Sequence, residues 1–256
     1  MGSSHAANAA GIELFNKGIC TSCSVMTPCT YAYDFIRWWT SNKHFDTGIH
    51  ITLASEWDNG KWRPVGSYNQ TSSLWSPLKF MWQTNDDVMK NAKKADVLHE
   101  MEAQIQLALL WGLEPSHFDL HMHSVKLVHG SFEDYVELAA KYNVVWEFTK
   151  GATPPNLLNP APTKPIDWSI SVGGEPGMNL DKKFECCHEV LANLKPGISL
   201  LTLHPVIDTP EARYIIPDWY DRNCEYKMFM SDETKKVIKE NNIELISYKN
   251  LREMIA

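Results

Sequence analysis

The feature that most constrains the fold is the alternation of short β-branched, apolar runs with segments of helical periodicity along the chain. Strands are expected at 19–26, 47–53, 116–122, 144–148, 166–172, 198–203 and 243–247. Helices are expected at 4–17, 31–39, 84–111, 132–141, 181–194 and 232–241. Strands that alternate with helices predict a parallel sheet, either closed as a barrel or open. Because no internal repeat divides the chain, we predict one domain over residues 1–256.

Several expected helices carry recognisable end signals. Ser4 and Gly18 suit the start and the stop of the first helix. Thr84, with Asp87 three residues later, resembles a capping box, and Ser231 can cap the last helix. Two segments lack any period, and we expect both to be loops: the Trp-rich stretch 55–83 and the Pro-rich stretch 153–165.

The composition of the chain argues against several functional classes. The chain has 24 Lys and Arg against 31 Asp and Glu, a net charge of −7, which disfavours a nucleic-acid-binding role. No apolar run is long enough to cross a membrane, and the N-terminus lacks a basic leader and an apolar signal core. Six unevenly spaced cysteines do not form a disulfide framework. We therefore expect a cytoplasmic protein with reduced thiols.

Four polar residues alternate with others in the stretch 116–123. If the whole stretch were a strand, His117, Asp119, His121 and His123 would point to the same face. A row of imidazoles and a carboxylate facing inward is costly unless a divalent metal or an anionic network compensates it. An exposed edge strand with polar residues facing water is the alternative interpretation.

Two further histidines stand at the ends of expected strands. His50 lies inside an apolar run, and His204 closes another run just before Pro205. Each could be a core or strand-end residue that bonds a backbone carbonyl. Each also stands where sites form in α/β proteins, at the carboxyl ends of strands.

Other candidates are weaker. Cys20 and Cys23 would lie on opposite faces of a strand, and we interpret both as core residues. No glycine-rich phosphate loop is present, so a nucleotide cofactor is not expected. In the long loop, Glu56, Trp57, Trp62 and Arg63 could clasp a sugar, or they could pack as a lid.

Taken in order, these segments resemble the YdjC-like carbohydrate deacetylases. The resemblance rests on Gly48-Ile49-His50-Ile51-Thr52-Leu53, on His117-Phe118-Asp119-Leu120-His121-Met122-His123, on Leu203-His204-Pro205 and on the opening helix, and it covers nearly the whole chain. The family, which includes the chitooligosaccharide deacetylases, has a distorted, TIM-like (β/α) barrel. Its members remove acetyl groups from N-acetylated sugars with a divalent metal held by an Asp and two His.

The resemblance implies roles for individual residues. His50 and His121 match the two metal histidines, and Asp119 matches a catalytic carboxylate beside them. His204 matches a His-Pro pair beside the substrate, and would protonate the departing amine. Trp57, Arg63 and His123 are the substrate-binding residues we expect.

The chain departs from the family pattern at its start. Family members begin with a strand that ends in an Asp-Asp pair, and the sequence from Met1 contains neither. We expect the first strand to be missing, through a start placed too late or through a truncation that impairs the enzyme.

The resemblance thus implies a metal-dependent hydrolase, a carbohydrate deacetylase that uses Mg or Zn. The alternatives are a catalytically impaired sugar-binding barrel and a metal-dependent hydrolase of another bond, such as a phosphoester. The partners expected are a small carbohydrate and a second copy of the chain in a homodimer, with no nucleic acid and no membrane.

Overall fold

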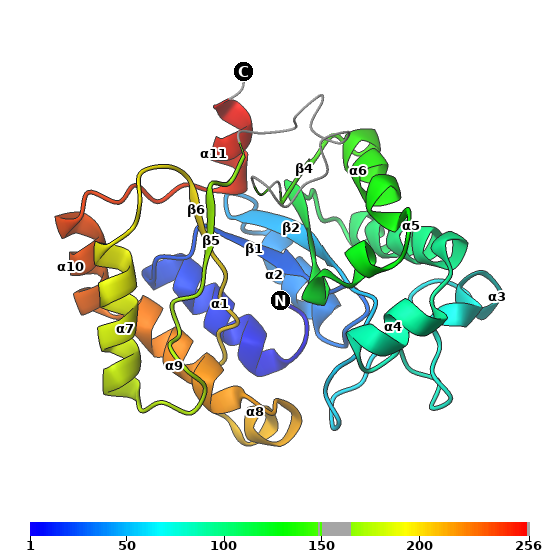
Figure 1. Ribbon diagram of the computed structural model, residues 1–256, viewed down its shortest axis with the longest axis horizontal. Helices are drawn as coiled ribbons and strands as arrows, with labels where there is room; N and C mark the ends of the chain where they lie inside the picture. The colour runs from blue at the N-terminus through cyan, green and yellow to red at the C-terminus, as the bar shows by residue number, and fades with distance from the viewer. Residues whose placement is uncertain (148, 150–164, 255–256) are drawn as a thin grey trace. The chain divides into compact units, whose positions relative to one another are not determined.

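The structure is a computed structural model that describes residues 1–147, 149 and 165–254 (Figure 1). Internal contacts divide the chain into two compact units. The first unit holds residues 1–4 and 22–147, and the second holds residues 5–21 and 148–256. Each unit is described by itself.

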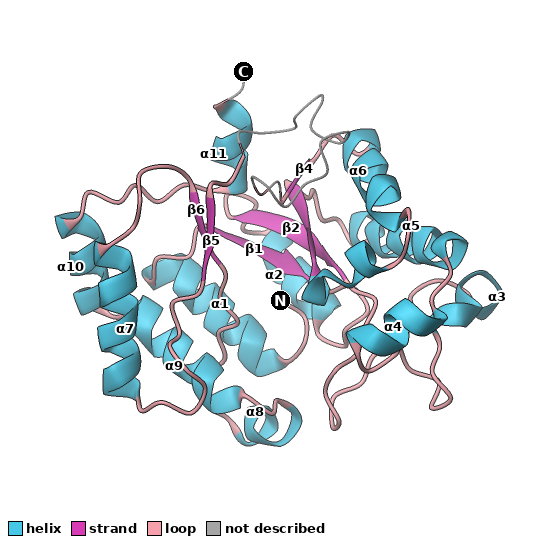
Figure 2. Cartoon of the chain, viewed as in Figure 1, coloured by secondary structure: helices cyan, strands magenta, loops and turns pink. Residues whose placement is uncertain are grey.

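The first unit is built on a parallel sheet of four strands in the order β1-β2-β3-β4 (Figure 2). The strands are β1 (Ser22–Val25), β2 (Asp46–Ile51), β3 (His117–Leu120) and β4 (Val145–Trp146). Residues alternate between the two faces, so on β2 the fully buried Ile49 and Ile51 lie on the face opposite His50. One face of the sheet is therefore apolar, and the other carries polar side chains.

Helices cover the apolar side chains of the first unit. They are α2 (Ala32–Thr40), α3 (Tyr68–Thr71), α4 (Asn85–Asn91), α5 (Lys94–Leu110) and α6 (Ser131–Lys141), with two 3₁₀ segments, η1 (Ser72–Leu74) and η2 (His121–Leu127). Phe35 of α2, Ile105 of α5 and Phe118 of β3 are all completely buried. Helix α5 contacts β2 as well as α3 and α6, so it connects the sheet to the long loop.

The second unit contains a parallel pair of strands, β5 (Trp168–Ile170) and β6 (Ser199–Leu201). Its helices are α1 (His5–Lys17), α7 (Leu180–Ala192), α8 (Pro210–Ile215), α9 (Trp219–Met230), α10 (Asp232–Glu240) and α11 (Tyr248–Glu253). A core of Leu14, Cys187, Leu191, Met228 and Phe229 joins α1, α7 and α9.

Several local predictions are confirmed. The helix that starts after Ser4 is α1, which ends at Lys17 just before Gly18. The side chains of Thr84 and Ser231 accept hydrogen bonds from the backbone N–H groups of Asp87 and Thr234, so both predicted caps are present. All six cysteines are free thiols.

Other predictions are wrong. The helix expected over 84–111 is two helices, because Ala92 and Lys93 adopt extended backbone angles between α4 and α5. The strand expected over 116–122 stops at Leu120, because Met122 and His123 take left-handed angles, with φ of 51° and 53°. The run 243–247 is not a strand: the Ile243 N–H bonds back to Ile238 O of α10, and Ser247 caps α11. The loop expected over 55–83 contains the short helix α3 and the 3₁₀ segment η1, and the sequence patterns do not predict α8, α9 and α11.

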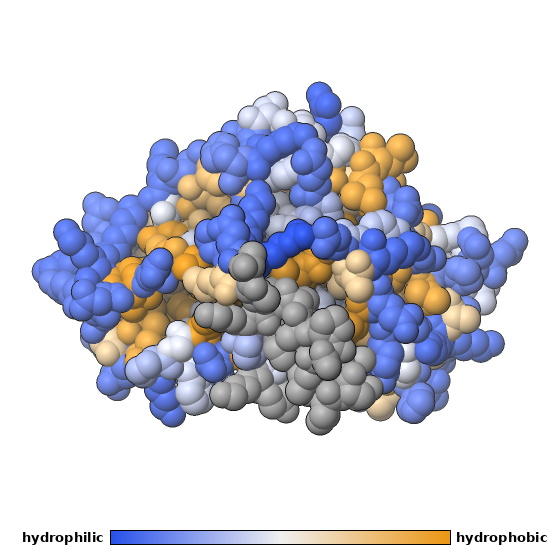
Figure 3. Space-filling model, turned by 90° about the horizontal axis from the view of Figure 1, so that it is seen from above, coloured by the Kyte–Doolittle hydropathy of each residue, from blue (hydrophilic) through white to orange (hydrophobic). Residues whose placement is uncertain are grey.

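The parallel α/β class is confirmed, whereas closure into a barrel is not shown. The described strands form one sheet of four and one of two, so the barrel and the single domain stay predictions. Of the Pro-rich segment, residues 153–164 lie outside the described residues. In the described part of the chain, no helix combines the length and the apolar character that a membrane span requires. On the face seen in Figure 3, hydrophilic side chains cover much of the described surface, and apolar ones form separate patches.

Candidate active site at the carboxyl ends of the strands

Three neighbouring strands of the first unit bring Ser24, His50 and Asp119 together. His50 of β2 is directly in register with Asp119 of β3, and its Nδ1 lies 2.8 Å from Asp119 Oδ1. Ser24 of β1 donates to Asp119 Oδ2 at 2.8 Å and also lies 3.3 Å from His50 Nδ1. All three contacts use the polar face of the sheet near the carboxyl ends of its strands.

The environment of Asp119 favours its ionised form. Burial raises the pKa of this carboxyl group, but the charges of His50 and His117 and the hydrogen bonds from His50 and Ser24 outweigh burial and lower the pKa to about 2. An ionised carboxylate only accepts hydrogen bonds, so Nδ1 of His50 must carry the proton. In its neutral form, this imidazole would have its lone pair on Nε2, and such a lone pair is what metal ligands and general bases use.

The residue that follows β3 brings a second imidazole to this point. His121 begins η2, and its Nε2 lies 2.9 Å from Glu56 Oε2 of the long loop. The rings of His50 and His121 are 5.4 Å apart between centroids and inclined by 68°. The two pairs, His50–Asp119 and His121–Glu56, therefore form one cluster.

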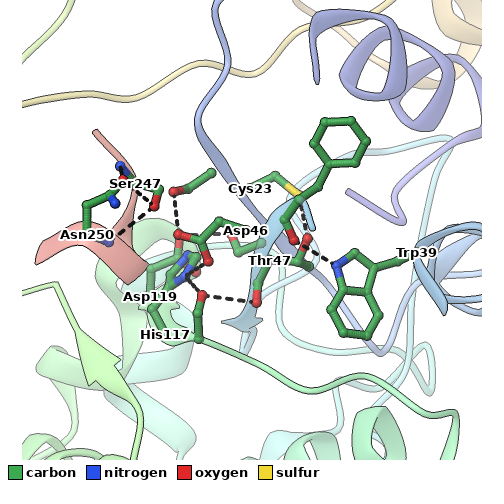
Figure 4. A network of polar contacts seen from close by, with 12 residues as sticks. Cys23, Trp39, Asp46, Thr47, His117, Asp119, Ser247 and Asn250 are labelled. Atoms are coloured by element: carbon green, nitrogen blue, oxygen red, sulfur yellow. Dashed lines mark hydrogen bonds and ion pairs between the residues drawn. The ribbon is translucent and has the colours of Figure 1, made fainter. Parts of the chain in front are cut away.

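Below this cluster lies a buried polar layer nearer the amino ends of the strands. His117 and Asp46 are 1% and 3% exposed, with Nδ1 and Oδ1 4.0 Å apart, and Figure 4 shows both beside Asp119. The ring of His117 packs over Gly48, where an added Cβ would lie 2.6 Å from its Nε2. His117 lies on the same strand face as Asp119 but stays in the interior. The prediction that all four polar residues of 117–123 point the same way is wrong, because β3 ends at Leu120 before His121 and His123.

The two imidazoles have a spacing that suits a shared cation. An ion about 2.1 Å from one nitrogen of each ring, at a roughly tetrahedral angle, would separate the ring centroids by about 5 Å. Among the described residues, however, no group of three or more His, Cys, Asp or Glu side chains is gathered closely enough to hold a metal ion. His50 and His121 are therefore a pair of suitable donors rather than a complete ligand set.

The expected substrate-binding residues have different surroundings. Trp57 is buried and packs edge to face on Trp62, with centroids 5.5 Å apart. Arg63 is exposed and lies over the ring of Phe80. His123 is exposed in η2. Their contact with a sugar stays a prediction, but in this structure Trp57 serves the core of the long loop.

His204 belongs to the second unit. It follows β6 and is exposed, and its backbone N–H donates to Glu225 Oε2 at 2.6 Å. Burial raises the pKa of Glu225 to about 6, although this hydrogen bond opposes the shift. The structure thus confirms the position of His204 after a strand, and its role as a proton donor stays a prediction.

Two members of the cluster, Ser24 and Glu56, are not predicted from the sequence as partners of the histidine cluster. Ser24 stands on β1 in the alternation that puts Ser22 on the same face, so period-two spacing was an available signal. The sequence suggests for Glu56 only a possible contact with a sugar. No local signal indicates its partner, because 65 residues separate it from His121.

A parallel α/β unit with imidazoles and carboxylates at the carboxyl ends of its strands has the architecture in which such folds bind small molecules. The chain belongs to the YdjC-like family, whose model matches residues 1–240.

Three relatives align with this chain along most of their own length. A carbohydrate deacetylase of Thermus thermophilus is 29% identical over 251 residues, which cover 94% of this chain and 87% of the relative. A carbohydrate deacetylase of Thermoanaerobacter pseudethanolicus is 26% identical over 242 residues, 94% of this chain and 92% of the relative. A carbohydrate deacetylase of Clostridium beijerinckii is 26% identical over 264 residues, 98% of this chain and 96% of the relative.

A solved structure supports the fold. The chain resembles an Enterococcus faecalis V583 protein, named for cellobiose-phosphate cleavage, with a TM-score of 0.81 and 18% identity. The match covers 98% of this chain and 95% of the other. At this level of identity the likeness concerns the fold alone.

Proposed function

We propose that this protein is a metal-dependent hydrolase that removes acetyl groups from N-acetylated sugars. The observation that carries the proposal is the cluster in which two imidazoles, each paired with a carboxylate, lie 5.4 Å apart at the ends of parallel strands. Three relatives that align along nearly their full length are carbohydrate deacetylases, which supports the same reaction here.

The carboxylates orient the imidazoles for this chemistry. Asp119 holds the Nδ1 proton of His50, and Ser24 fixes Asp119 through its other oxygen. Glu56 accepts from Nε2 of His121 in the same manner, which leaves Nδ1 of that ring with the lone pair. Such carboxylate–histidine pairs fix the tautomer and raise the basicity of a ligating imidazole.

His50 and His121 would hold the divalent cation, Mg or Zn. When bound, such an ion lowers the pKa of a water molecule and polarises a carbonyl group. In the overall reaction, water adds its oxygen to the acetyl carbon, the C–N bond breaks, and acetate and an amino sugar leave. The departing nitrogen needs a proton, and we assign its delivery to His204, with Trp57, Arg63 and His123 as sugar contacts.

The test is acetate release from N-acetylglucosamine oligosaccharides by the metal-stripped protein after addition of Mg or Zn. We expect His50→Gln to lower kcat/KM by about 100-fold or more, as loss of a ligand or acid–base group does. His129→Gln is the matched control, because His129 is an exposed imidazole outside the cluster.

The same assay separates the alternatives. A thermal shift with the sugar but no acetate under any metal would contradict the hydrolase and indicate a sugar-binding protein. Phosphate release from a phosphorylated sugar, without acetate release, would show that the bond hydrolysed is a phosphoester and not an amide. A His204→Gln variant with normal turnover would remove the proton-donor role alone.

A further inference from the structure

Helix α5 carries two buried polar side chains that the proposed chemistry does not use. Glu100 and Gln104 stand one turn apart and are both completely buried. No ion pair to Glu100 exists in the part of the chain that the structure describes. A buried carboxylate without a cation is costly, so its hydrogen bonds need an explanation.

Both side chains bind the backbone at the two ends of one segment. Gln104 accepts from Thr52 N at 3.0 Å and donates to Thr52 O at 2.6 Å. Glu100 accepts from Val65 N at 2.9 Å and from Gly66 N at 2.8 Å. Gln104 also donates to Glu100 Oε1 at 2.8 Å, which joins the two anchor points into one unit.

The turn at Gly66 is shaped to receive the carboxylate. A Cβ at this position would lie 2.6 Å from Thr71 Cγ2 and 3.2 Å from Glu100 Oε2. Thr71 is itself buried, and its hydroxyl donates to Ser67 O at 2.9 Å. A side chain at Gly66 would therefore collide with Thr71 and crowd the carboxylate of Glu100.

Between the two anchor points, the segment 52–66 delivers residues to the histidine cluster. Glu56 contacts His121 Nε2 at 2.9 Å, and the ring of Trp62 lies 6.0 Å from the same imidazole. Trp62 is held inside the segment, where its Nε1 donates to Ala54 O at 2.7 Å and its N–H donates to Ser55 Oγ at 3.1 Å. The segment is internally fixed, and its middle also pairs with residues 81–82, through Ser55 N to Trp82 O at 2.8 Å and Met81 N to Trp62 O at 3.1 Å. Glu100 and Gln104 add the contacts that hold its two ends.

We propose that Glu100 and Gln104 form a clamp that positions the segment 52–66, and through it Glu56 and Trp62, against His121. Both are positioning residues, because neither touches the cluster directly. The role of the clamp in turnover rests on the proposed function, whereas its role in holding the segment does not.

The first test needs no substitution. Native-state hydrogen exchange of the full chain, followed under mild denaturant, should show the N–H groups of Thr52, Val65 and Gly66 opening together with one free energy. Separate openings of Thr52 and of the Val65–Gly66 pair would overturn the proposal. Because no substrate is involved, this result is independent of the proposed reaction.

Two variants should weaken the clamp, one at the carboxylate and one at the backbone turn that the carboxylate binds. In Glu100→Gln, one acceptor oxygen is replaced by an amide N–H group that faces a backbone N–H group. Amide hydrogen exchange in residues 52–66 should therefore accelerate by about tenfold or more. Gly66→Ala should act likewise through the collision at the turn, and it keeps the test valid if Glu100→Gln does not fold. Glu102→Gln is the control on the same helix, because Glu102 is on the surface and pairs with Lys141.

A double-mutant cycle separates positioning from general structure. If Glu100 acts through Glu56, the loss of kcat in Glu100→Gln should largely vanish when Glu56→Gln is already present, while KM changes little. Fully additive losses in kcat, or unchanged exchange in 52–66 in both clamp variants, would refute the clamp. Faster exchange in a protein that releases no acetate would keep the clamp and reject the proposed function.

Discussion

Nδ1 of His50 lies 2.8 Å from Oδ1 of Asp119, across two parallel strands on which these residues are exact neighbours in register. The strands fix this distance, because the backbone hydrogen bonds of a parallel ladder set the relation between β2 and β3. The carboxylate can therefore hold one tautomer of the imidazole without the loss of conformational entropy that ordering a loop would require.

Replacing the carboxylate should remove that control. We expect Asp119→Asn to lower kcat/KM for acetate release by about 10- to 100-fold, the usual loss when the carboxylate partner of a ligating histidine is removed. Steady-state kinetics checks this, with Asp232→Asn as the control, since the side chain of Asp232 is 98% exposed. Equal kinetics of Asp119→Asn and the parent protein would show that the pair is only structural.

The contact between Glu56 and His121 should matter in a similar way. Glu56→Gln keeps the size of the side chain but lets its amide turn an N–H toward His121, so the fixed orientation of the ring is lost. We expect kcat to fall by about tenfold or more. Glu114→Gln, at a side chain that is 72% exposed and pairs with Lys43, serves as the matched comparison. A fall in that variant as large as in Glu56→Gln would contradict a specific role for Glu56.

Glu100 should make stability depend on pH. Burial raises its pKa to about 7, although hydrogen bonds from Val65, Gly66 and Gln104 oppose the shift. The folded chain holds the proton of Glu100 more tightly than the unfolded chain does. Glu100 therefore makes its full contribution to the free energy of unfolding below about pH 4.5, and this contribution is lost as pH rises through about 7. The loss amounts to at most about 3 kcal/mol.

Urea unfolding at several values between pH 5 and pH 8 measures this effect. The free energy of unfolding of the parent protein should decrease over that range relative to Glu100→Gln, which has no proton to lose at this site. Parallel curves for the two proteins would mean that Glu100 stays in one protonation state throughout.

Gly48 should not tolerate a side chain. Its added Cβ would lie 2.6 Å from the buried ring of His117, and the carbonyl oxygen of His117 would also collide with it. We expect Gly48→Ala to destabilise the fold by about 1–3 kcal/mol, as overpacking of a core does. Gly177 offers a contrast, since φ there is +76° and nothing lies within 4 Å of an added Cβ. A cost at Gly48 no larger than at Gly177 would show that the sheet can move away from His117.

The sequence by itself determined the parallel α/β class, most helices and the main strands of the sheet. These follow from hydrophobic periodicity and capping chemistry, which act over a few residues, as at Thr84 and Ser231. It also indicated His50, Asp119 and His121, because polar residues at the ends of apolar strands are visible in a linear pattern. The end of β3 was missed, since left-handed angles at Met122 and His123 have no signature in those residue types.

Only the tertiary structure decided which of these residues meet. Period two correctly places His117 on the face of Asp119, but only the packing encloses His117 over Gly48. His123, which the same pattern adds to this row, lies exposed beyond the turn that ends β3. Glu56 contacts His121 across 65 positions of the sequence, and Glu100 accepts a hydrogen bond from Gly66 N across 34 positions. The physical reason is that such contacts depend on how the sheet, α5 and the long loop pack in space, and packing is a property of the whole unit.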